Sequence, residues 1–555
     1  MARITRSLLR YALLLAATGC SRDTGADTGA DTGDGTGADS GSGEDSGADT
    51  GSGEDSGSGE DTGTDLGPDM TPPYEPEASW PFALRPLSTR DDLRIVDDRG
   101  RDTLLRGVNI TSLGEYWQGN PDSPPTLETT DADWDEMAAS GVSVIRLVVH
   151  WSRIEPQRGV IDEGYLDRIE SYVEAAARRG IHTVIDMHQD AYSAFISTPP
   201  GEICPEGTTP AKGWDGAPAW AVFTDGASTC ISGDRNSSPA VRNAWNAFYD
   251  NRDGIRDRFV ASWAAVAARF AGRPEVAGYD LLNEPEVSRP AALLAPLYND
   301  LLGATVSAIR TAESGAPFDH LLFIEPAIPA GDPSFGVVVP SRSAIGVPLE
   351  NVVSAPHNYA ESIALGGAAL TIELANQLYL NAARTLRMPT WIGEYGFWDT
   401  SDSTLEKVGR YAADEDRRLL HGAWWQWRQP CGDPHSIGPT GEFEVVHLHT
   451  LGCPGDVDLG RTEPFMRVLS RGFARAAPGR LTRIENDLET GSTRIEGDAM
   501  ATPGELVVWT PTPESTHAVE LTGLRNLRSF VVGGGRVLVA EVESPAAYAL
   551  SVAPR

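Results

Sequence analysis

The central part of the chain alternates between short apolar segments and longer stretches whose apolar positions recur with helical spacing. Helical patterns cover, for example, residues 165–179, 241–270 and 370–386. Eight short segments rich in apolar and β-branched residues predict strands, at 106–110, 142–149, 182–188, 276–284, 320–327, 351–359, 389–396 and 422–429. Apolar strands that alternate with helices are typical of parallel strands covered on both faces. Eight such units predict an α/β fold, the (β/α)₈ TIM barrel.

A doubly wound open sheet is the alternative fold for the same alternation. Such sheets more often carry a glycine-rich phosphate loop directly after the first strand. Here the first strand runs from Gly107 through Val108, Asn109 and Ile110 into Thr111, which is not such a loop. The barrel is therefore the favoured interpretation.

The pattern changes on both sides of the barrel. Upstream, residues 93–96 and 103–105 flank the turn 97–100, which predicts a hairpin that caps the floor of the barrel. Further downstream, short alternating runs between Gly and Pro turns predict a small all-β sandwich, with strands at 505–510, 517–521, 536–542 and 547–552. We therefore expect a barrel domain over 73–477, with the hairpin cap, and a C-terminal β-sandwich domain over 478–555.

The first twenty residues have the pattern of a signal peptide. Arg3, Arg6 and Arg10 precede an apolar run over 11–17, and small residues then lead to Cys20. This segment resembles a bacterial lipoprotein signal, which implies that Cys20 is lipidated and anchors the chain to the membrane. A plain secretory signal is the alternative. We expect an exported protein, lipid-anchored at the bacterial cell surface or envelope, or otherwise secreted.

Residues 21–72 form an acidic segment rich in Gly, Ser, Thr and Asp. Short units such as Asp-Thr-Gly and Gly-Ser-Gly recur, and almost nothing apolar is available to bury. A segment of this composition cannot recover the entropy lost on ordering, and its carboxylates repel one another. We predict a disordered linker between the anchor and the barrel.

The overall charge narrows the possible partners. The net charge is −34 at pH 7, and the sequence pI is about 4.6. Binding to nucleic acid needs a concentrated positive surface, so nucleic acid is not an expected partner. The chain has no run of about 18 consecutive apolar residues, so we expect no ordinary membrane-spanning helix. We expect a monomer.

The cysteine count agrees with export. Besides Cys20, the chain has four cysteines, Cys204, Cys230, Cys431 and Cys453. An even number in an exported chain indicates disulfides. Three pairings are possible, and we favour the local pairs 204–230 and 431–453. A metal site is the alternative, but the cysteines lack the close Cys-x-x-Cys spacing that such sites use.

Polar and aromatic side chains gather at the C-terminal ends of the predicted strands, where the active sites of (β/α)₈ barrels lie. They include Arg146, His188, Asp190, Asn283, Glu284, His357, Tyr359, Glu394 and Trp425. Glycosidic-bond hydrolysis needs a proton donor for the leaving oxygen and a second carboxylate for the cationic transition state. Glu284 and Glu394 fit these two roles, and Arg146 and Tyr359 would keep Glu394 ionised. Asn283 would bind a sugar hydroxyl, and Trp425 would stack on a sugar ring.

The ordered set of strand ends resembles a known family. Asn283-Glu284-Pro285, Ile392-Gly393-Glu394-Tyr395-Gly396 and Arg146 are similar to the motifs of retaining glycoside hydrolases of clan A, family 5. The resemblance implies that Glu284 is the acid/base, Glu394 the nucleophile, and that the reaction retains configuration. The residues alone leave retention and inversion open, because the choice depends on the carboxylate separation. This chemistry needs no cofactor, and we expect neither a cofactor nor a metal.

A narrower resemblance is to the endoglycoceramidase branch, whose members cleave the bond between a glycan and ceramide. It is carried by residues 184–190 and 214–218, by Trp424-Trp425-Gln426-Trp427, and by the link at 461–465. It implies that His188 and Asp190 contact the sugar next to the scissile bond, and that the barrel mouth has an apolar slot for lipid. The chain departs from the branch after Gly107-Val108-Asn109. A Lys is usual soon after this point, but residues 110–117 contain none.

Two other functions fit the same residues. The barrel would also suit an endo-β-glucanase or β-mannanase that acts on polysaccharide without lipid. A carbohydrate-binding surface lipoprotein without activity is the second alternative. The expected partner is therefore a glycan or glycolipid, and an exported TIM-barrel glycosidase is the favoured interpretation.

Overall fold

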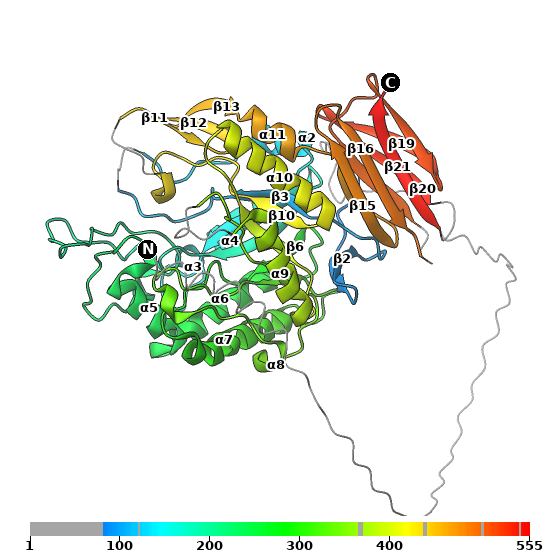
Figure 1. Ribbon diagram of the computed structural model, residues 1–555. Coiled ribbons are helices and arrows are strands. Elements are labelled where there is room, and N and C mark those ends of the chain that lie inside the picture. The colour runs from blue at the N-terminus through cyan, green and yellow to red at the C-terminus, as the bar shows by residue number, and fades with distance from the viewer. Residues whose placement is uncertain (1–81, 120–122, 364–369, 437–440, 501–503, 543–545) are drawn as a thin grey trace, which may run out of the picture.

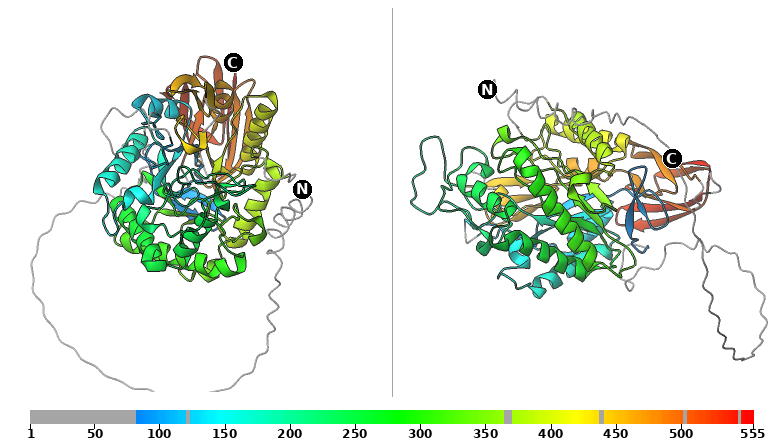
Figure 2. Two further views of the ribbon diagram at one scale, coloured as in Figure 1. Left: turned by 90° about the vertical axis from the view of Figure 1, so that its left-hand side faces the viewer. Right: turned by 90° about the horizontal axis from the view of Figure 1, so that it is seen from below.

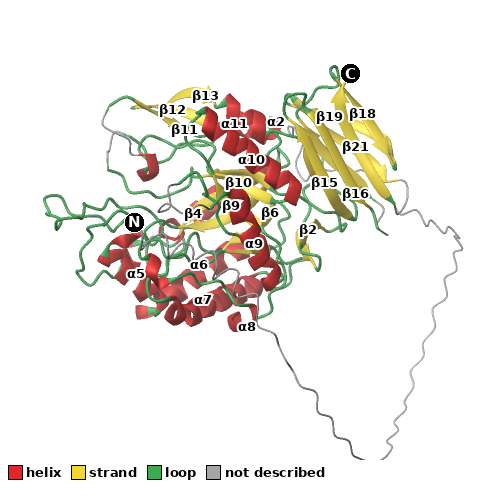
Figure 3. Ribbon diagram, in the orientation of Figure 1, coloured by secondary structure: helices red, strands yellow, loops and turns green. Residues whose placement is uncertain are grey.

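The computed structural model describes residues 82–555, apart from 120–122, 364–369, 437–440, 501–503 and 543–545 (Figure 1). The predicted signal peptide, Cys20 and the acidic linker lie outside the described residues. The described part consists of a barrel surrounded by helices and a β-sandwich packed beside it (Figures 1 and 3).

Eight parallel strands form the barrel, as predicted. They are β3 (Arg106–Ile110), β4 (Val144–His150), β5 (His182–His188), β6 (Val276–Asp280), β7 (Leu321–Ile324), β8 (Val352–Ser354), β9 (Trp391–Tyr395) and β10 (His421–Trp424). Their order in the sheet is β8-β7-β6-β5-β4-β3-β10-β9. A parallel bridge between Ser354 and Thr390 joins the two outer strands, β8 and β9, so the sheet closes on itself.

Helices surround the strands, as the view of Figure 2 (left) shows. The α-helices are α2 (Asp131–Ala139), α3 (Trp151–Ile154), α4 (Glu163–Ala177), α5 (Pro239–Tyr249), α6 (Ile255–Phe270), α7 (Ala291–Ala312), α8 (Arg342–Ile345), α9 (Ile372–Leu386), α10 (Asp402–Arg418) and α11 (Glu463–Leu469). Every residue of β4 and β5 is buried. This burial explains why the strands read as apolar runs rather than as alternating patterns.

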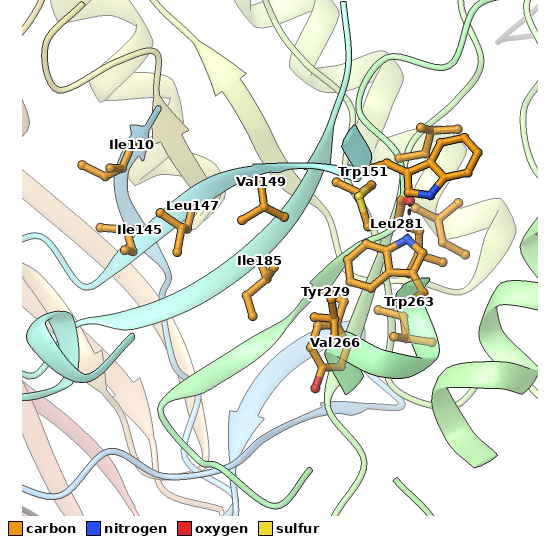
Figure 4. Close-up of a cluster of buried hydrophobic side chains, with 14 of the residues drawn as sticks. Ile110, Ile145, Leu147, Val149, Trp151, Ile185, Trp263, Val266, Tyr279 and Leu281 are labelled. Atoms are coloured by element: carbon orange, nitrogen blue, oxygen red, sulfur yellow. Dashed lines mark hydrogen bonds between the residues drawn. The ribbon is translucent and has the colours of Figure 1, made fainter. Parts of the chain in front are cut away.

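The core between β4, β5 and the helices is filled by branched and aromatic side chains. Ile145, Leu147 and Val149 of β4 belong to one apolar cluster with Ile185 of β5 and Trp263 of α6 (Figure 4). The Trp263 indole also donates a hydrogen bond of 2.9 Å to the backbone carbonyl of Leu281. That bond anchors the segment after β6, which carries two of the predicted site residues, against the outer helices.

The single helix predicted over 241–270 is wrong, because the structure has two helices there. Between α5 and α6, Asn251 and Gly254 adopt left-handed backbone conformations, with φ of 53° and 73°. A residue with positive φ ends a helix, and Gly and Asn accept this conformation most easily. The Asn-Arg-Asp-Gly sequence at 251–254 therefore breaks the pattern.

The predicted hairpin pairs differently from our expectation. β1 (Leu87–Arg90) pairs with β2 (Arg94–Asp97), while the segment after the turn adds a single antiparallel bridge between Val96 and Asp102. The backbone N–H of Thr89 donates a hydrogen bond of 2.9 Å to Asn351, which directly precedes β8. The hairpin therefore contacts the N-terminal end of a barrel strand.

The C-terminal strands form a sandwich of two four-stranded antiparallel sheets. One sheet has the order β14-β17-β20-β19 and the other β15-β16-β21-β18. The strands are β14 (Phe473–Ala476), β15 (Arg480–Asp487), β16 (Ser492–Asp498), β17 (Glu505–Thr510), β18 (His517–Thr522), β19 (Leu524–Val532), β20 (Gly535–Val542) and β21 (Ala547–Pro554). Ile495, Trp509, Leu538 and Leu550 are buried in one apolar cluster. The first strand, β14, begins before residue 478.

Within the described residues, α7 is the one helix long and apolar enough to cross a membrane by length and composition. Half of its most apolar stretch is buried, and it packs against α6 in the outer ring of the barrel. Pro296, Asn299 and Asp300 also interrupt its apolar sequence. We interpret α7 as a barrel helix.

Both local disulfides form, as predicted. Cys204 pairs with Cys230 in the loop after β5, and Cys431 pairs with Cys453 in the segment after β10. The second segment includes a three-stranded antiparallel sheet of β11 (Phe443–Val446), β12 (His449–Cys453) and β13 (Val457–Arg461). Both disulfide-closed loops follow strand ends, so they lie on the face where the candidate site is expected.

Candidate active site

The carboxylate of Glu394 has a different partner on each oxygen. Glu394 lies on β9, where Nη1 of Arg146 donates a hydrogen bond of 2.6 Å to its Oε1. The hydroxyl of Tyr359 donates a hydrogen bond of 2.7 Å to its Oε2. Two hydrogen bonds from different residues, one of them charge-assisted, hold the carboxylate in one orientation.

Arg146 is fully buried in β4 and organises the acidic groups beneath Glu394. Its guanidinium ion-pairs with Asp280 at 2.9 Å, Asp186 at 3.0 Å and Glu325 at 3.1 Å. It also donates a hydrogen bond of 2.9 Å to Oδ1 of Asn283. Buried carboxylates need such a cation, because an isolated buried charge is unfavourable.

Glu284 follows β6 rather than ending it, since the structure ends that strand at Asp280. The backbone at Glu284 has a φ of 36°, and its N–H donates a hydrogen bond of 2.9 Å to Oε2 of Glu325. Non-glycine residues rarely adopt positive φ, and such strain is held in place by its surroundings. The turn directs the Glu284 side chain toward His357.

Two cations contact the Glu284 carboxylate. Nδ1 of His357 lies 2.9 Å from its Oε1, and Nη2 of Arg235 lies 3.4 Å from its Oε2. Burial alone would raise the pKa of Glu284, but the hydrogen bond and charge of His357 and the charge of Arg235 outweigh burial. The pKa of Glu284 is therefore held below its ordinary value.

His357 lies between three carboxylates. Its ring nitrogens are 3.2 Å from Glu325 and 3.5 Å from Glu394, in addition to the contact with Glu284. Burial disfavours the charged imidazolium, but the surrounding carboxylates raise the pKa of His357 well above its ordinary value. Its Nδ1 atom lies between the two glutamates, 2.9 Å from Glu284 and 3.5 Å from Glu394.

The two glutamates face the same space. One carboxylate oxygen of Glu284, one of Glu394 and one ring nitrogen of His357 all lie within 4.8 Å of one another. Retaining glycosidases place their two carboxyl groups about 5–5.5 Å apart, whereas inverting enzymes leave about 6.5–9.5 Å for a water. The bound of 4.8 Å between the oxygens lies closer to the first range than to the second.

A second group of predicted residues lies beside this pair. The ring of His188 stacks on Trp425, with centroids 5.4 Å apart and planes inclined by 16°. Nδ1 of His188 lies 2.7 Å from Oδ2 of Asp186. Burial alone would lower the pKa of His188, but the nearby Asp186 carboxylate outweighs burial and raises that pKa well above its ordinary value. Asn283 bonds the backbone carbonyl of Gln189 at 3.0 Å.

Of the three tryptophans at the end of β10, Trp425 contacts the candidate site. Its ring also lies 5.8 Å from that of His435. The neighbouring Trp424 instead packs on Phe465, and the indole of Trp427 donates a hydrogen bond to Asp133 at 3.0 Å. All of the predicted sugar-site side chains therefore gather at one end of the barrel.

The sequence did not identify Arg235 and His435, which both bind Asp190. Arg235 forms an ion pair with Oδ1 of Asp190, and Nε2 of His435 lies 2.5 Å from Oδ2. Burial alone would raise the pKa of Asp190, but Arg235, His188 and His435 hold it well below its ordinary value. Both residues sit in loops, five and four residues after Cys230 and Cys431. That proximity to the disulfides is the only sequence signal that could have found them.

Among the residues that the structure describes, two clusters have enough nitrogen and oxygen donors to be considered as cation sites: Glu284 with His357 and Glu394, and Asp190 with Asp215 and His435. In the first, the ring nitrogens of His357 already contact Glu284, Glu325 and Glu394. In the second, burial raises the pKa of Asp215 to about 8, which favours its neutral form, and Arg235 already pairs with Asp190. Both clusters suit proton and hydrogen-bond chemistry better.

Comparison with known proteins identifies relatives with ceramide-related names. The chain is 33% identical over 205 residues to endoglycoceramidase I of Rhodococcus hoagii and 26% identical over 283 residues to an endoglycoceramidase of Cyanea nozakii. These alignments cover 35% and 46% of this chain, and 36% and 52% of the two relatives. The chain thus matches between about a third and a half of the length of these curated relatives.

Solved structures match over more of the chain. The crystal structure of an endogalactoceramidase has a TM-score of 0.77 and 34% sequence identity, and covers 85% of this chain and 100% of its own. Endo-glycoceramidase II from Rhodococcus sp. has a TM-score of 0.62 at 23% identity, covering 83% and 99%. The second match supports the fold alone.

The family model named Cellulase (glycosyl hydrolase family 5) matches residues 96–430, which is more than half of the chain. This range spans all eight barrel strands and both glutamates. The chain belongs to glycosyl hydrolase family 5.

Proposed function

We propose that this protein is a retaining, endo-acting glycoside hydrolase that cleaves the β-glycosidic bond between the glycan and ceramide of glycosphingolipids. The observation that carries the hydrolase assignment is the approach of Glu284 and Glu394 to within 4.8 Å. Their partners differ, because Glu394 is held by Arg146 and Tyr359 whereas Glu284 is held by His357 and Arg235.

The first step of the proposed reaction forms a glycosyl–enzyme. An oxygen of Glu394 attacks the anomeric carbon, and the bond from that carbon to the leaving oxygen breaks. Protonated Glu284 donates its proton to the leaving oxygen, which departs as an alcohol. Arg146 and Tyr359 orient the attacking carboxylate. In the second step, ionised Glu284 takes a proton from water, whose oxygen displaces Glu394 from the same carbon. Two inversions give net retention.

The ceramide assignment rests on the relatives and on an apolar edge beside Tyr359. The structure with 34% identity over nearly the whole described chain is an endogalactoceramidase. Next to Tyr359, Trp398 stacks at a centroid distance of 5.7 Å and is 37% exposed, while Ile363 is 44% exposed. Exposed apolar groups of this size beside a reacting carboxylate fit a lipid aglycone better than a second sugar.

The deciding experiment compares lipid and soluble substrates. Purified protein is incubated with galactosyl- and glucosyl-linked glycosphingolipids, and separately with carboxymethyl cellulose and mannan. Release of intact glycan and ceramide from lipid alone supports the proposal, and the two lipid arms identify the first sugar. Cleavage of the polysaccharides alone would assign an endo-β-glucanase or β-mannanase instead.

A variant pair tests the lipid contact. Trp398→Ala is expected to raise KM for the glycolipid several-fold while KM for a soluble aryl glycoside stays within twofold. Val531→Ala is the control, because Val531 is also an exposed apolar residue, 77% exposed, but lies on β19 of the sandwich. An equal change for both substrates in Trp398→Ala would contradict a lipid role for this edge.

Location is a separate part of the proposal. We propose that the chain is exported and held at the bacterial envelope by lipid on Cys20, with the acidic segment as a tether. The two disulfides support an oxidising compartment, because such bonds persist outside the cytosol. Metabolic labelling with an alkyne-tagged fatty acid, compared between wild type and Cys20→Ser, tests the anchor. Equal labelling of both would exclude it.

A further inference from the structure

Arg235 is the cation beside Glu284 whose partners allow it to move. It begins the short 3-10 helix η2 (Arg235–Ser237), in the loop that follows the Cys204–Cys230 disulfide. Its Nη2 atom contacts both Asp190 and Glu284, the second at 3.4 Å. Its guanidinium lies over the ring of Trp214, 4.8 Å from the centroid. A flat aromatic face supports a guanidinium without fixing it to one hydrogen-bonding geometry.

The other cation at Glu284 is held more rigidly. His357 is buried and lies within 3.5 Å of three carboxylates, so it cannot leave Glu284 without disturbing Glu325 and Glu394. The Arg235 side chain is 26% exposed, and its second partner, Asp190, accepts it on Oδ1 whether or not the contact with Glu284 persists. Arg235 can therefore change its distance to Glu284 and keep one ion pair throughout.

The proposed reaction needs such a change. Glu284 must hold a proton while the leaving oxygen departs and must be ionised when it activates water. A cation at 3.4 Å favours the ionised form, which suits the second role and opposes the first. The titratable and charged side chains that face Glu284 are Asp190, Asp234, Arg235, Glu325, His357, Tyr359 and Glu394. Among them, Arg235 and His357 are the cations.

We propose that Arg235 is a positioning residue that controls the charge of Glu284, favouring the base form when close to it and the acid form when it moves away from Glu284 and keeps its ion pair with Asp190. This inference rests on the proposed function. According to this inference, a sugar bound against Asp190 and His188 sets the position of Arg235. Sugar binding is thereby coupled to proton donation by Glu284. The structure shows the resting arrangement, in which Arg235 contacts both acids.

The test measures the ionisation of Glu284 directly and therefore does not depend on turnover. Carbon-13 carboxyl NMR titration of Arg235→Gln and Arg235→Lys is compared with wild type, and Glu284→Gln identifies the resonance. We expect Arg235→Gln to raise the titration midpoint by about one pH unit, in the range for loss of a nearby opposite charge. Arg235→Lys keeps the charge and should stay within about 0.3 unit of wild type.

Kinetics add a second readout. The alkaline limb of the kcat/KM profile for an aryl glycoside should move upward by about the same one unit in Arg235→Gln and not in Arg235→Lys, while the acidic limb stays unchanged in both. Should Arg235→Gln fail to fold, Arg235→Met serves in its place. Identical midpoints and limbs in wild type and the neutral variants would overturn the inference. If Arg235→Gln shifts the titration midpoint of Glu284 but the wild-type protein hydrolyses no glycoside, the proposed function is overturned and the Arg235–Glu284 coupling is established.

Discussion

Glu284 and Glu394 come from distant parts of the chain, yet their carboxylate oxygens approach within 4.8 Å across the mouth of the barrel. β6 and β9 are not neighbours in the sheet order, so the two side chains reach the shared space from different sides of the ring. This arrangement leaves the anomeric carbon of a bound sugar room between a nucleophile and a proton donor.

Glu394→Gln is expected to abolish turnover while the fold persists. The amide keeps the size of the carboxylate but is not a nucleophile, so kcat should fall by more than about a thousandfold. Hydrolysis rates, a melting curve and circular dichroism check this. Activity near the wild-type level in a correctly folded variant would end the assignment of the nucleophile.

Glu284→Ala should slow hydrolysis most for substrates with poor leaving groups. An alcohol such as the ceramide hydroxyl departs only when protonated, so the loss should reach about 10²–10⁴-fold, whereas an activated aryl glycoside should lose much less. Added azide should restore part of the rate with the aryl substrate, because a small anion can attack the intermediate without a general base. Equal losses on both substrates would count against the acid role.

The strand-end logic predicted most of the site from sequence. Asn283 and Glu284 follow β6, Glu394 is the last residue but one of β9, and a closed parallel barrel brings those ends together. Arg146 differs, because it lies inside β4, at the third of its seven positions, and reaches Glu394 through its long side chain. Periodicity shows strand ends well, because an apolar run stops there. The alternation of side chains along a strand predicted that Trp424 and Trp427 face away from Trp425, and the structure confirms that only Trp425 of these three contacts the candidate site.

Arg235 and His435 were not predicted, because no apolar strand or helix pattern marks their positions. Both lie in three-residue 3-10 helices within long connecting segments, and such a short helix leaves no apolar periodicity in the sequence that could place a side chain. The helix expected over 241–270 failed on local backbone conformation, since Asn251 and Gly254 turn the chain without interrupting the apolar spacing. The predicted hairpin is incomplete, because β2 pairs along its length with residues 87–90, whereas the segment after the turn adds only the bridge from Asp102 to Val96 and a hydrogen bond from the Thr103 N–H to the Ile95 carbonyl.

Tyr359→Phe should reduce kcat about 10–100-fold, because a hydrogen bond to a charged group contributes about 1.5–3 kcal/mol. The lost bond is the 2.7 Å contact from the Tyr359 hydroxyl to Oε2 of Glu394. Tyr548→Phe is the matched control, since the Tyr548 hydroxyl bonds the backbone carbonyl of Pro478 in the sandwich. The control should lower stability without changing kcat. A Tyr359→Phe enzyme with wild-type kcat would show that Arg146 alone orients the nucleophile.

Asp416→Ala should destabilise the protein by about 3 kcal/mol, because the buried Arg106 and Arg471 lose one of the two carboxylates that pair with them and keep only Glu415. Asp416 accepts from Arg106 at 2.6 Å, from Arg471 at 3.0 Å and from Asn486 at 2.8 Å, and so joins the barrel to the sandwich. Urea unfolding measures the change. Arg417→Ala, next along α10 and 62% exposed, is the control and should stay within about 0.5 kcal/mol of wild type. A similar small effect for both would show that the network does not stabilise the junction.

His435 makes stability depend on pH in a defined window. Burial would lower its pKa, but Asp433 and Asp190 raise the pKa of His435 to about 10, above the ordinary value of 6.5. A raised pKa in the folded state gives a stabilisation that is complete below about pH 6.5 and is lost as the pH rises toward 10. The difference in unfolding free energy between wild type and His435→Gln should therefore be largest at pH 6, shrink steadily between pH 7 and pH 10, and level off beyond it.

Guanidinium unfolding curves across this range measure the difference, and the comparison with the variant removes contributions from other titrating groups. A constant difference from pH 6 to pH 10 would mean that His435 stays in one protonation state throughout, and that its contacts with Asp190 and Asp433 act as neutral hydrogen bonds.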